Sequence, residues 1–255
     1  GAVPMRRDPK LASNATDGNR LFMNEVDQVE ADIYIQVLCT SPFVTIETIR
    51  KAVDILQNGK EYDSVVLGRS EKVYEWYDNK PAYDIENIPN SGDLPDRVSE
   101  AMSLYVIRAE AANQTRRRVG NAPCIITGTP IEMIDVNTPE EFTLAETVAT
   151  GMLAEENRRL RLLGTFLSSP ILSDICDEMG LNAVLSRNFI CNLPYRRVIG
   201  RARTLEIRPT NPGESPTGIY EALQSYKLVA NNDIIVVKNG LPEYAYFGEM
   251  NMSLA

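Results

Sequence analysis

Few residue types in this chain could carry out chemistry, because the chain contains no histidine. That absence excludes catalytic triads built on histidine and any histidine metal ligand from within the chain. Carboxylates, backbone amides, arginine and lysine remain, and the metal that suits carboxylate oxygens is a hard cation such as Mg²⁺. The segment MIDVNTPEEF, residues 133–142, places Asp135 and Asn137 just before a predicted helix start.

The residues that follow Asn137 have a structural explanation. Thr138 can serve as an N-cap, Pro139 suits the first helical position, and Glu141 completes a capping box. That motif does not need Asp135. Two interpretations of Asp135 are open: it binds a metal and a phosphate, or it ends a strand and caps the turn that follows.

The elements that must position these residues alternate between strand and helix. Residues 32–43 predict a buried strand that runs into a loop, and residues 45–60 predict an amphipathic helix that stops at Gly59. Residues 62–69 predict a further strand, and strand, helix, strand is the signature of a layered α/β domain. Residues 74–97, rich in aromatic, proline and turn residues, predict a hairpin or excursion over the main sheet.

The rest of the first region continues this alternation. Residues 101–112 predict a strand and then a helix, and residues 124–136 predict a strand pair. A predicted helix over residues 139–159 closes the region.

Residues 158–165 are interpreted as a domain boundary, because a self-contained pattern follows them. It begins with a capped helix at 169–180 and continues with a strand containing Gly200, where the backbone must bend or approach another segment closely. The sequence therefore predicts two α/β domains, residues 1–160 and 161–255.

Three segments of the first domain resemble the CMP-sialic acid synthetase (acylneuraminate cytidylyltransferase) family in order and spacing. They are VPMRRDPKLA at residues 3–12, VLCTSPF at 37–43 and IDVNTPEEFTLAE at 134–146. The resemblance implies a layered, nucleotidyltransferase-like α/β domain. It also implies an enzyme that joins a sialic-acid-like keto-sugar acid to CTP and releases pyrophosphate, with Mg²⁺ neutralising the triphosphate.

The resemblance implies roles for individual residues. Asp135 and Asn137 would hold Mg²⁺, and Arg7 would contact the nucleotide or the sugar acid. The edge of the substrate cleft would be formed by Thr40, Ser41 and Pro42. The alternatives are a surface salt bridge for Arg7 and an ordinary turn after a strand for the cleft residues.

The chain departs from the family pattern at several places. Asn137 stands where the family has the second aspartate of an Asp-x-Asp pair, and a neutral carbonyl binds a cation more weakly. Leu38 replaces a glutamine and Val44 an arginine, which leaves the identity of the sugar acid open. No glycine-rich phosphate loop occurs in the sequence, so we expect this domain to be incomplete at its N-terminus and inactive alone.

The second domain resembles the regulator of ribonuclease activity A family, which includes hydroxy-methyl-oxoglutarate aldolases. The matching segments are ILSDICDEMG at 171–180, GRARTLEI at 200–207, NNDIIVVKNG at 231–240 and YFGEMNMSLA at 246–255. The resemblance implies an α/β swivelling-type domain, incomplete at its C-terminus. A pyruvate-like carboxylate would bind at the start of a helix, at Gly248, Glu249, Met250 and Asn251. An ordinary helix start is the alternative.

Functions from different classes are compatible with these patterns. The chain is a segment of a cytidylyltransferase fused to an aldolase-like domain, a non-catalytic binding or regulatory protein built from both folds, or a pyruvate-type aldolase. Both families self-associate, so we expect a homo-oligomer. The aromatic group of Tyr74, Trp76 and Tyr77 suits a dimer interface better than a sugar-stacking platform.

Composition narrows the choice of partners and location. A formal net charge of −9 argues against a protein that binds nucleic acid through a basic surface. The run Arg116, Arg117, Arg118 is a local exception, interpreted as a solvated loop or helix end. No apolar run approaches the roughly 20 residues of a membrane span, and the start has no signal-peptide pattern, so we expect a cytoplasmic protein without a membrane partner.

Overall fold

The chain divides into two units, each described here by itself. The computed structural model describes residues 2–13, 15–183, 189–190, 192, 197–244 and 247–248. The contacts between residues separate Gly1–Val148, called unit 1, from Ala149–Ala255, called unit 2. The division falls earlier in the chain than the boundary expected at residue 160.

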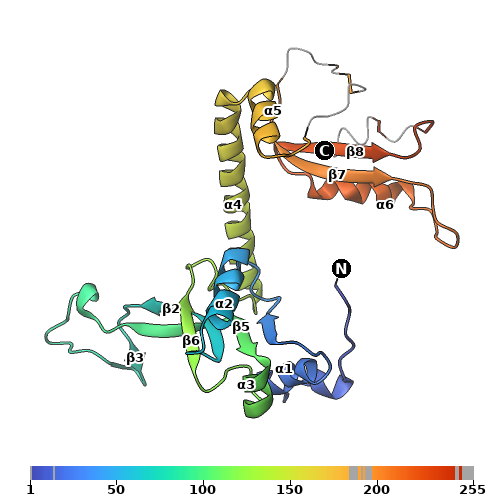
Figure 1. The fold of residues 1–255 in the computed structure, drawn as a ribbon. Coiled ribbons are helices and arrows are strands. Elements are labelled where there is room, and N and C mark those ends of the chain that lie inside the picture. Colours follow the sequence, from blue (N-terminus) through green and yellow to red (C-terminus); the bar gives the residue numbers. More distant parts are fainter. Residues whose placement is uncertain are drawn as a thin grey trace. The chain divides into compact units, whose positions relative to one another are not determined.

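Unit 1 is built on a four-stranded sheet (Figure 1). The strand order is β1-β5-β2-β6; β5 runs antiparallel to β1 and β2, and β2 and β6 are parallel. The predicted α/β class is confirmed. The elements of the unit, in order, are η1 (Pro9–Ala12), α1 (Gly18–Val26), β1 (Ile33–Val37), α2 (Ile46–Asn58), β2 (Ser64–Glu71), β3 (Trp76–Tyr77), β4 (Lys80–Pro81), η2 (Ser91–Asp93), β5 (Arg97–Arg108), α3 (Ala109–Thr115), β6 (Pro123–Thr127) and the start of α4 (Pro139–Phe166).

Helices cover both faces of this sheet. On one face, α2 buries Ala52 and Leu56 against Leu104 and Val106 of β5. On the other face, α1 and α3 bury their apolar residues against Ile107 of the same strand. Successive side chains of a strand point to opposite faces, which is why one strand serves both layers. Each fully buried aliphatic side chain contributes about 1.5–3 kcal/mol to the stability of the fold.

The first strand is present as predicted, but it is not buried. Ile35 and Val37 of β1 are 47% and 44% exposed. The reason is the strand order, in which β1 is the terminal strand of the sheet. The apolar run alone could not distinguish a central strand from an edge strand.

Helix α2 begins and ends as predicted. Thr45 is its N-cap and accepts a hydrogen bond from the amide of Thr48 at 3.2 Å, and Gly59 is its C-cap. Arg108 of β5 donates to the carbonyls of Leu56 and Gly59 at the far end. A guanidinium is favourable there, because the last carbonyls of a helix are unsatisfied and carry partial negative charge.

A bulge interrupts β5 where it pairs with β2. From Val66 to Gly68, β2 advances two positions, while its partners in β5 run five positions from Tyr105 to Glu100. Met102, inside the bulge, has a φ of 53°. The number of extra residues in β5 is odd, so Glu100 and Tyr105 face the same side of the sheet although they are five residues apart.

Residues 72–96 leave the main sheet after β2 and return to it at β5. Within them, β3 and β4 form a separate antiparallel pair. The turn residues Asp78 and Asn79 have φ values of 47° and 61°, as a two-residue type I′ hairpin requires. The predicted hairpin is confirmed, and we call this segment the excursion.

The strand pair predicted over residues 124–136 is wrong. β6 ends at Thr127, and an irregular loop over residues 128–138 leads to α4, so Asp135 lies in a loop and not at the tip of a strand. The predicted capping box at the start of α4 is confirmed. Thr138 Oγ1 accepts a hydrogen bond from the amide of Glu141 at 3.2 Å, and the Glu141 carboxylate accepts one from the amide of Thr138 at 2.8 Å.

Unit 2 contains a parallel pair of strands, β7 and β8. α4 continues to Phe166 without a break at residues 158–165, so the helix predicted to end at residue 159 is too short. A Cβ on Gly200 would lie 1.8 Å from the carbonyl oxygen of Asn232, which is the close approach expected of this glycine. The elements of the unit after α4 are α5 (Ser169–Glu178), β7 (Arg201–Ile207), α6 (Ile219–Gln224), η3 (Ser225–Leu228) and β8 (Asp233–Asn239).

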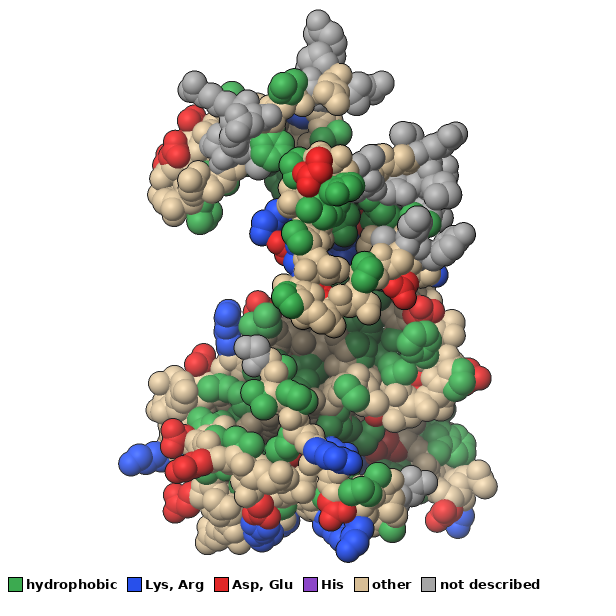
Figure 2. Space-filling model, turned by 90° about the vertical axis from the view of Figure 1, so that its right-hand side faces the viewer, with side chains coloured by type: hydrophobic (Ala, Val, Ile, Leu, Met, Phe, Trp, Pro, Cys, Tyr) green, Lys and Arg blue, Asp and Glu red, His purple; other side chains and the backbone are tan. Residues whose placement is uncertain are grey.

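The charge pattern of the surface and the character of the helices both bear on function. On the face drawn in Figure 2, Lys and Arg side chains are interspersed with Asp and Glu side chains. Among the helices that the structure describes, none combines the length and apolar character needed to cross a membrane.

Candidate functional site

Two loops of unit 1 that carry predicted site residues meet in space. The loop after β1 holds Thr40 and Ser41, and the loop after β6 holds Asp135. The amide of Val136 donates to the carbonyl of Thr40 at 2.8 Å, and Ser41 Oγ lies 3.5 Å from Asp135 Oδ1. The strand pairings make β1 and β6 run in the same direction, so their carboxyl ends share one edge of the sheet.

Neutral groups hold Asp135 in this position. Ser41 is 4% exposed and meets Oδ1 at long hydrogen-bond distance. Asn137 Nδ2 donates to Oδ2 at 2.7 Å. Within the described part of the chain, no Lys or Arg side chain forms an ion pair with Asp135. The carboxylate therefore has no cationic partner in the described structure, and the acceptor positions that Ser41 and Asn137 do not use are left for a ligand.

The oxygen donors around Asp135 fit a weakly bound hard cation. Asp135 supplies one carboxylate and Ser41 a hydroxyl, and Asn137 can supply its carbonyl oxygen if its amide rotates and gives up its bond to Asp135. Mg²⁺ commonly uses one or two protein carboxylates and completes its shell with waters and substrate phosphates. Over the residues that the structure describes, no cluster of three or more Asp, Glu or Cys side chains suits a metal.

A buried glutamate fixes the loop that carries Asp135. Glu132 is 3% exposed. Its carboxylate accepts hydrogen bonds from the amide of Thr129 at 2.9 Å, the amide of Thr45 at 3.3 Å and the hydroxyl of Thr48 at 2.5 Å. Burial raises the pKa of Glu132, but the bonds from Thr129, Thr48 and Thr45 outweigh burial and lower it below its ordinary 4.5. An ionised Glu132 thus ties this loop to the start of α2.

Sequence reasoning missed Glu132, although a signal for it exists. Thr129 and Glu132 have the same Thr-x-x-Glu spacing as the capping box at Thr138 and Glu141. The reciprocal bond from the amide of Glu132 to Thr129 Oγ1, at 3.3 Å, shows that the motif is formed without a helix behind it. The contacts with α2 leave no trace in the local pattern, because Thr48 lies 84 positions before Glu132 in the chain.

A second polar group that sequence reasoning missed surrounds Tyr105. Its hydroxyl donates to the carboxylate of Glu100, and the guanidinium carbon of Arg118 lies 3.9 Å from its ring centroid. Burial and the bond to Glu100 raise the pKa of Tyr105, the charge of Arg118 opposes the rise, and the Asp135 carboxylate adds to it. The backbone of Tyr105 also pairs with Gln36 near the end of β1, the strand that leads into the loop of Thr40 and Ser41. The bulge in β5 that creates this group has no recognisable signal in the sequence.

The remaining predicted site residues have simple surroundings. Arg7 is exposed, and its Nη2 lies 3.4 Å from Glu25 Oε1 of α1, which is the arrangement of the salt-bridge alternative. Pro42 is exposed beside Ser41. Gly248 is exposed, and a Cβ built on it would meet no atom within 4 Å. The last predicted residues lie outside the described part of the chain: Glu249, Met250 and Asn251.

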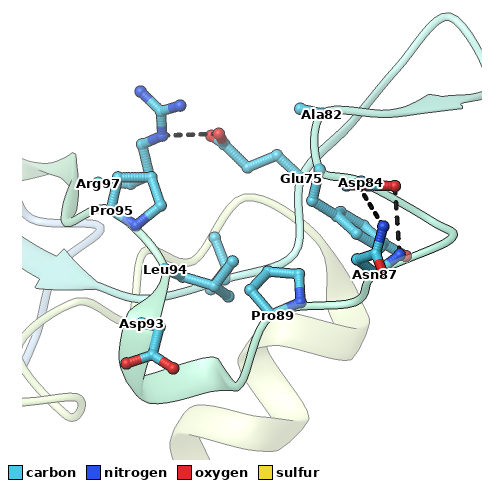
Figure 3. Close-up of a pocket in the computed structure, with 11 residues that line it drawn as sticks. Glu75, Ala82, Asp84, Asn87, Pro89, Asp93, Leu94, Pro95 and Arg97 are labelled. Atoms are coloured by element: carbon cyan, nitrogen blue, oxygen red, sulfur yellow. Dashed lines mark hydrogen bonds and ion pairs between the residues drawn. The ribbon is translucent and has the colours of Figure 1, made fainter.

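A cavity of about 300 Å³ lies in the excursion and involves none of the predicted site residues. Figure 3 draws Leu94 and Pro89 below the ion pair between Glu75 and Arg97, whose oxygen and nitrogen are 2.7 Å apart. Its lining combines apolar side chains with charges that already have partners. None of the residues that line this cavity belongs to the polar group around Asp135.

Unit 2 has a buried carboxylate of a different kind. The side chain of Asp233 is fully buried, and it accepts bonds from Arg203 Nε at 2.7 Å, Arg201 Nε at 3.2 Å and the amide of Ala230 at 2.9 Å. The bonds from Arg203, Ala230 and Arg201 outweigh desolvation and lower the pKa of Asp233 to about 2. Its charge is neutralised internally, so Asp233 joins β7 to β8 and is not a ligand-binding group.

Comparisons with known proteins find similarity among solved structures alone. No protein-family profile and no curated protein sequence matches the chain. Among solved structures, 4-diphosphocytidyl-2C-methyl-D-erythritolsynthase from Anaerococcus prevotii DSM 20548 is similar at 10% sequence identity and a TM-score of 0.38. The match covers 53% of this chain and 68% of that one. A similarity this weak assigns no function to the chain.

Proposed function

We propose that unit 1 binds the acidic acceptor and the Mg²⁺ of a cytidylyl transfer reaction. The observation that supports this most is the meeting of Ser41 with Asp135, which are 94 positions apart in the chain. Each lies in a different one of the segments that resemble CMP-sialic acid synthetases. Their approach at the carboxyl ends of two strands is what a shared substrate cleft requires.

The roles of the residues follow from their chemistry. Asp135, with Asn137, holds Mg²⁺, which when bound neutralises charge on the triphosphate of CTP. Ser41, whose hydroxyl donates to Asp135 Oδ1, would form the edge of the substrate cleft together with Thr40 and Pro42. Arg7 is free to exchange its weak surface pair with Glu25 for an anionic substrate group, because exposed ion pairs contribute only about 0–1 kcal/mol.

For unit 2 we propose an aldolase-like regulator domain that binds a pyruvate-like acid at residues 248–251. The support is the resemblance of the segments that form β7 and β8, which pair in parallel along their full length. A keto-sugar acid and pyruvate share the 2-keto acid group, so a fusion of the two domains joins related substrates.

We also propose that the chain forms a homo-oligomer through the excursion. Trp76 and Tyr77 of its hairpin are 58% and 60% exposed, and Ile85 and Ile88 beyond it are 61% and 64% exposed. Aromatic side chains are enriched in interfaces, where their large apolar surface is removed from water. Light scattering tests this, and a monomer at micromolar concentration would contradict it.

A non-catalytic binding protein is the second candidate. It is favoured by the single carboxylate at the proposed metal site and by Leu38 and Val44, which replace polar residues of the family. Under this alternative the fold and the acid-binding surface persist, and no cytidylyl transfer occurs.

Restoring the missing carboxylate separates these candidates. If Asp135 and Asn137 face one cation, Asn137→Asp adds a second charged ligand and tightens Mn²⁺ binding about tenfold or more. Unchanged affinity would reject the metal site and leave the non-catalytic protein. The chain has no glycine-rich phosphate loop, so we expect it to release no pyrophosphate from CTP, Mg²⁺ and N-acetylneuraminate, either as the natural sequence or with this substitution.

A further inference from the structure

The three consecutive arginines after α3 have three different environments. Arg116, in the left-handed conformation with a φ of 55°, directs its two terminal nitrogens at the carboxylate oxygens of Asp27, at 2.7 and 2.6 Å. Arg117 donates to Asn121 Oδ1 at 2.6 Å. Arg118 instead stacks on Tyr105, 3.9 Å from its ring centroid. The expectation of a solvated run thus fits Arg116 and Arg117 but not Arg118.

The start of α1 fixes Arg118 in place. Its backbone amide donates to Asn19 Oδ1 at 3.1 Å. Its guanidinium lies against the backbone of Gly18, where a Cβ would come within 2.9 Å of Nη1. Its side chain is 25% exposed. A planar cation pressed between an aromatic ring and a helix start has lost its rotamer freedom already, so a ligand does not have to order it.

The guanidinium of Arg118 is nevertheless not matched by a hydrogen-bonded anion. Its contact with a carboxylate is with Glu100, at 3.8 Å, and Glu100 already accepts the hydroxyl of Tyr105. Across the described residues, no side chain or carbonyl accepts a hydrogen bond from this guanidinium. Arg116 differs from Arg118, because its guanidinium forms two short hydrogen bonds with the carboxylate of Asp27.

We propose that Arg118 binds the anionic group of a substrate held near Ser41 and Asp135. Tyr105 connects the two places, since its ring touches Arg118 and its backbone pairs with Gln36 of β1, four positions before Thr40. The fork of guanidinium donors matches a planar carboxylate and also a phosphate, so the ligand class is a small oxyanion on a larger substrate. The inference rests on the proposed function and identifies which cation receives the acid of the acceptor.

The test is an NMR titration of the chain with pyruvate, N-acetylneuraminate and inorganic phosphate in separate arms. We expect at least one to shift the amides of Arg118 and Asn19. Arg118→Met then weakens that binding about tenfold or more, the loss of a charge-assisted hydrogen bond. The matched control Arg116→Met removes the same charge two positions away and leaves the affinity within about twofold, because Asp27 already occupies that guanidinium.

Several outcomes would overturn this assignment. They are unshifted amides at about 50 mM anion, equal affinity in wild type and Arg118→Met, or an equal loss in Arg116→Met. If Arg118→Met does not fold, Arg118→Lys replaces it, with the expectation of weaker carboxylate binding because the planar fork is lost. The keto acid arms against the phosphate arm show whether the oxyanion is a carboxylate or a phosphate.

The same measurements distinguish this inference from the proposed function. If anion binding depends on Arg118 but the affinity for Mn²⁺ is the same in wild type and Asn137→Asp, the proposed metal site is rejected and the anion site at Arg118 is retained. If Asn137→Asp tightens Mn²⁺ binding but Arg118→Met does not change the affinity for anions, the metal site is retained and the anion site at Arg118 is rejected.

Discussion

Asp135 in unit 1 and Asp233 in unit 2 are both held by hydrogen bonds, but they differ in what holds them. Asp233 is fully buried between two arginines and a backbone amide, which use its acceptors and neutralise its charge. Asp135 meets only a serine hydroxyl and an asparagine amide in the described structure. One carboxylate is satisfied by the protein, and the other is positioned but not neutralised.

This difference separates groups that stabilise the fold from groups that can serve a ligand. Removing a partner from a closed set of buried charges leaves the others uncompensated, which is costly. Removing a carboxylate that has no cationic partner costs the fold little, but takes away a ligand site. Glu132 resembles Asp233, because its hydrogen-bond partners lie within the protein, although these partners are neutral. Arg118 resembles Asp135, because its charge has no close partner of opposite sign among the described residues.

The largest effect on stability is expected at Glu132. Glu132→Ala leaves the buried donors of Thr45, Thr48 and Thr129 without an acceptor, and we expect a loss of about 3 kcal/mol from unit 1. Amide hydrogen exchange in the core of β5 measures it. A loss below about 1 kcal/mol would show that Glu132 contributes little to the stability of unit 1 and does not resemble Asp233 in this respect.

The pH dependence of that loss sharpens the prediction. Because the folded pKa of Glu132 lies below 4.5, its contribution to stability is complete above the unfolded pKa and disappears as the pH falls through the folded pKa. The gap between wild type and Glu132→Gln should therefore be widest near neutral pH and narrow in acid, below about pH 4.5. A gap that stays constant across this range would show that the charge of Glu132 is not what the donors bind.

A smaller but clear effect is expected at Asp233. Asp233→Asn leaves Arg201 and Arg203 without their shared anion and should lower the melting temperature of unit 2 by roughly 5 °C. Wild type should lose this advantage as the pH falls from the unfolded pKa near 3.8 toward about 2. Exchange at the amides of β8 reports on it, and protection equal to wild type would contradict the closed arrangement.

The smallest effect on stability is expected at Asp135 itself. Asp135→Asn keeps the size of the side chain and removes a charge that has no described cationic partner, so unit 1 should change by no more than about 0.5 kcal/mol. Hydrogen exchange in the same β5 amides checks this. A loss as large as that of Glu132→Ala would mean that Asp135 stabilises the fold, and it would contradict the proposed difference between Asp135 and Asp233.

Sequence patterns predicted what depends on neighbours in the chain. The helix stop at Gly59, the box at Thr138 and Glu141 and the hairpin within residues 74–97 all form as expected, since each depends mainly on residues within a few positions. The loop at Asp135 was expected to be a strand, because an apolar run does not show whether a partner strand is available.

The parts of the site that escaped prediction depend on contacts between distant segments. Glu132 reaches α2, and Arg118 reaches Tyr105 and the start of α1. The approach of Glu100 to Tyr105 needs a bulge whose position is set by pairing with β2. The full extent of α4 was also missed, because the self-contained pattern after residues 158–165 suggested a boundary there, although most of these residues favour a helix.

The most direct test of the account is to locate a bound cation by paramagnetic broadening. Mn²⁺ added to the isotope-labelled chain should broaden the amides of Ser41, Val136 and Asn137 first, and this pattern should vanish in Asp135→Asn while the fold is unchanged. Equal broadening of these amides in both proteins, or none in either, would contradict the claim that Asp135 is a carboxylate held open for a metal.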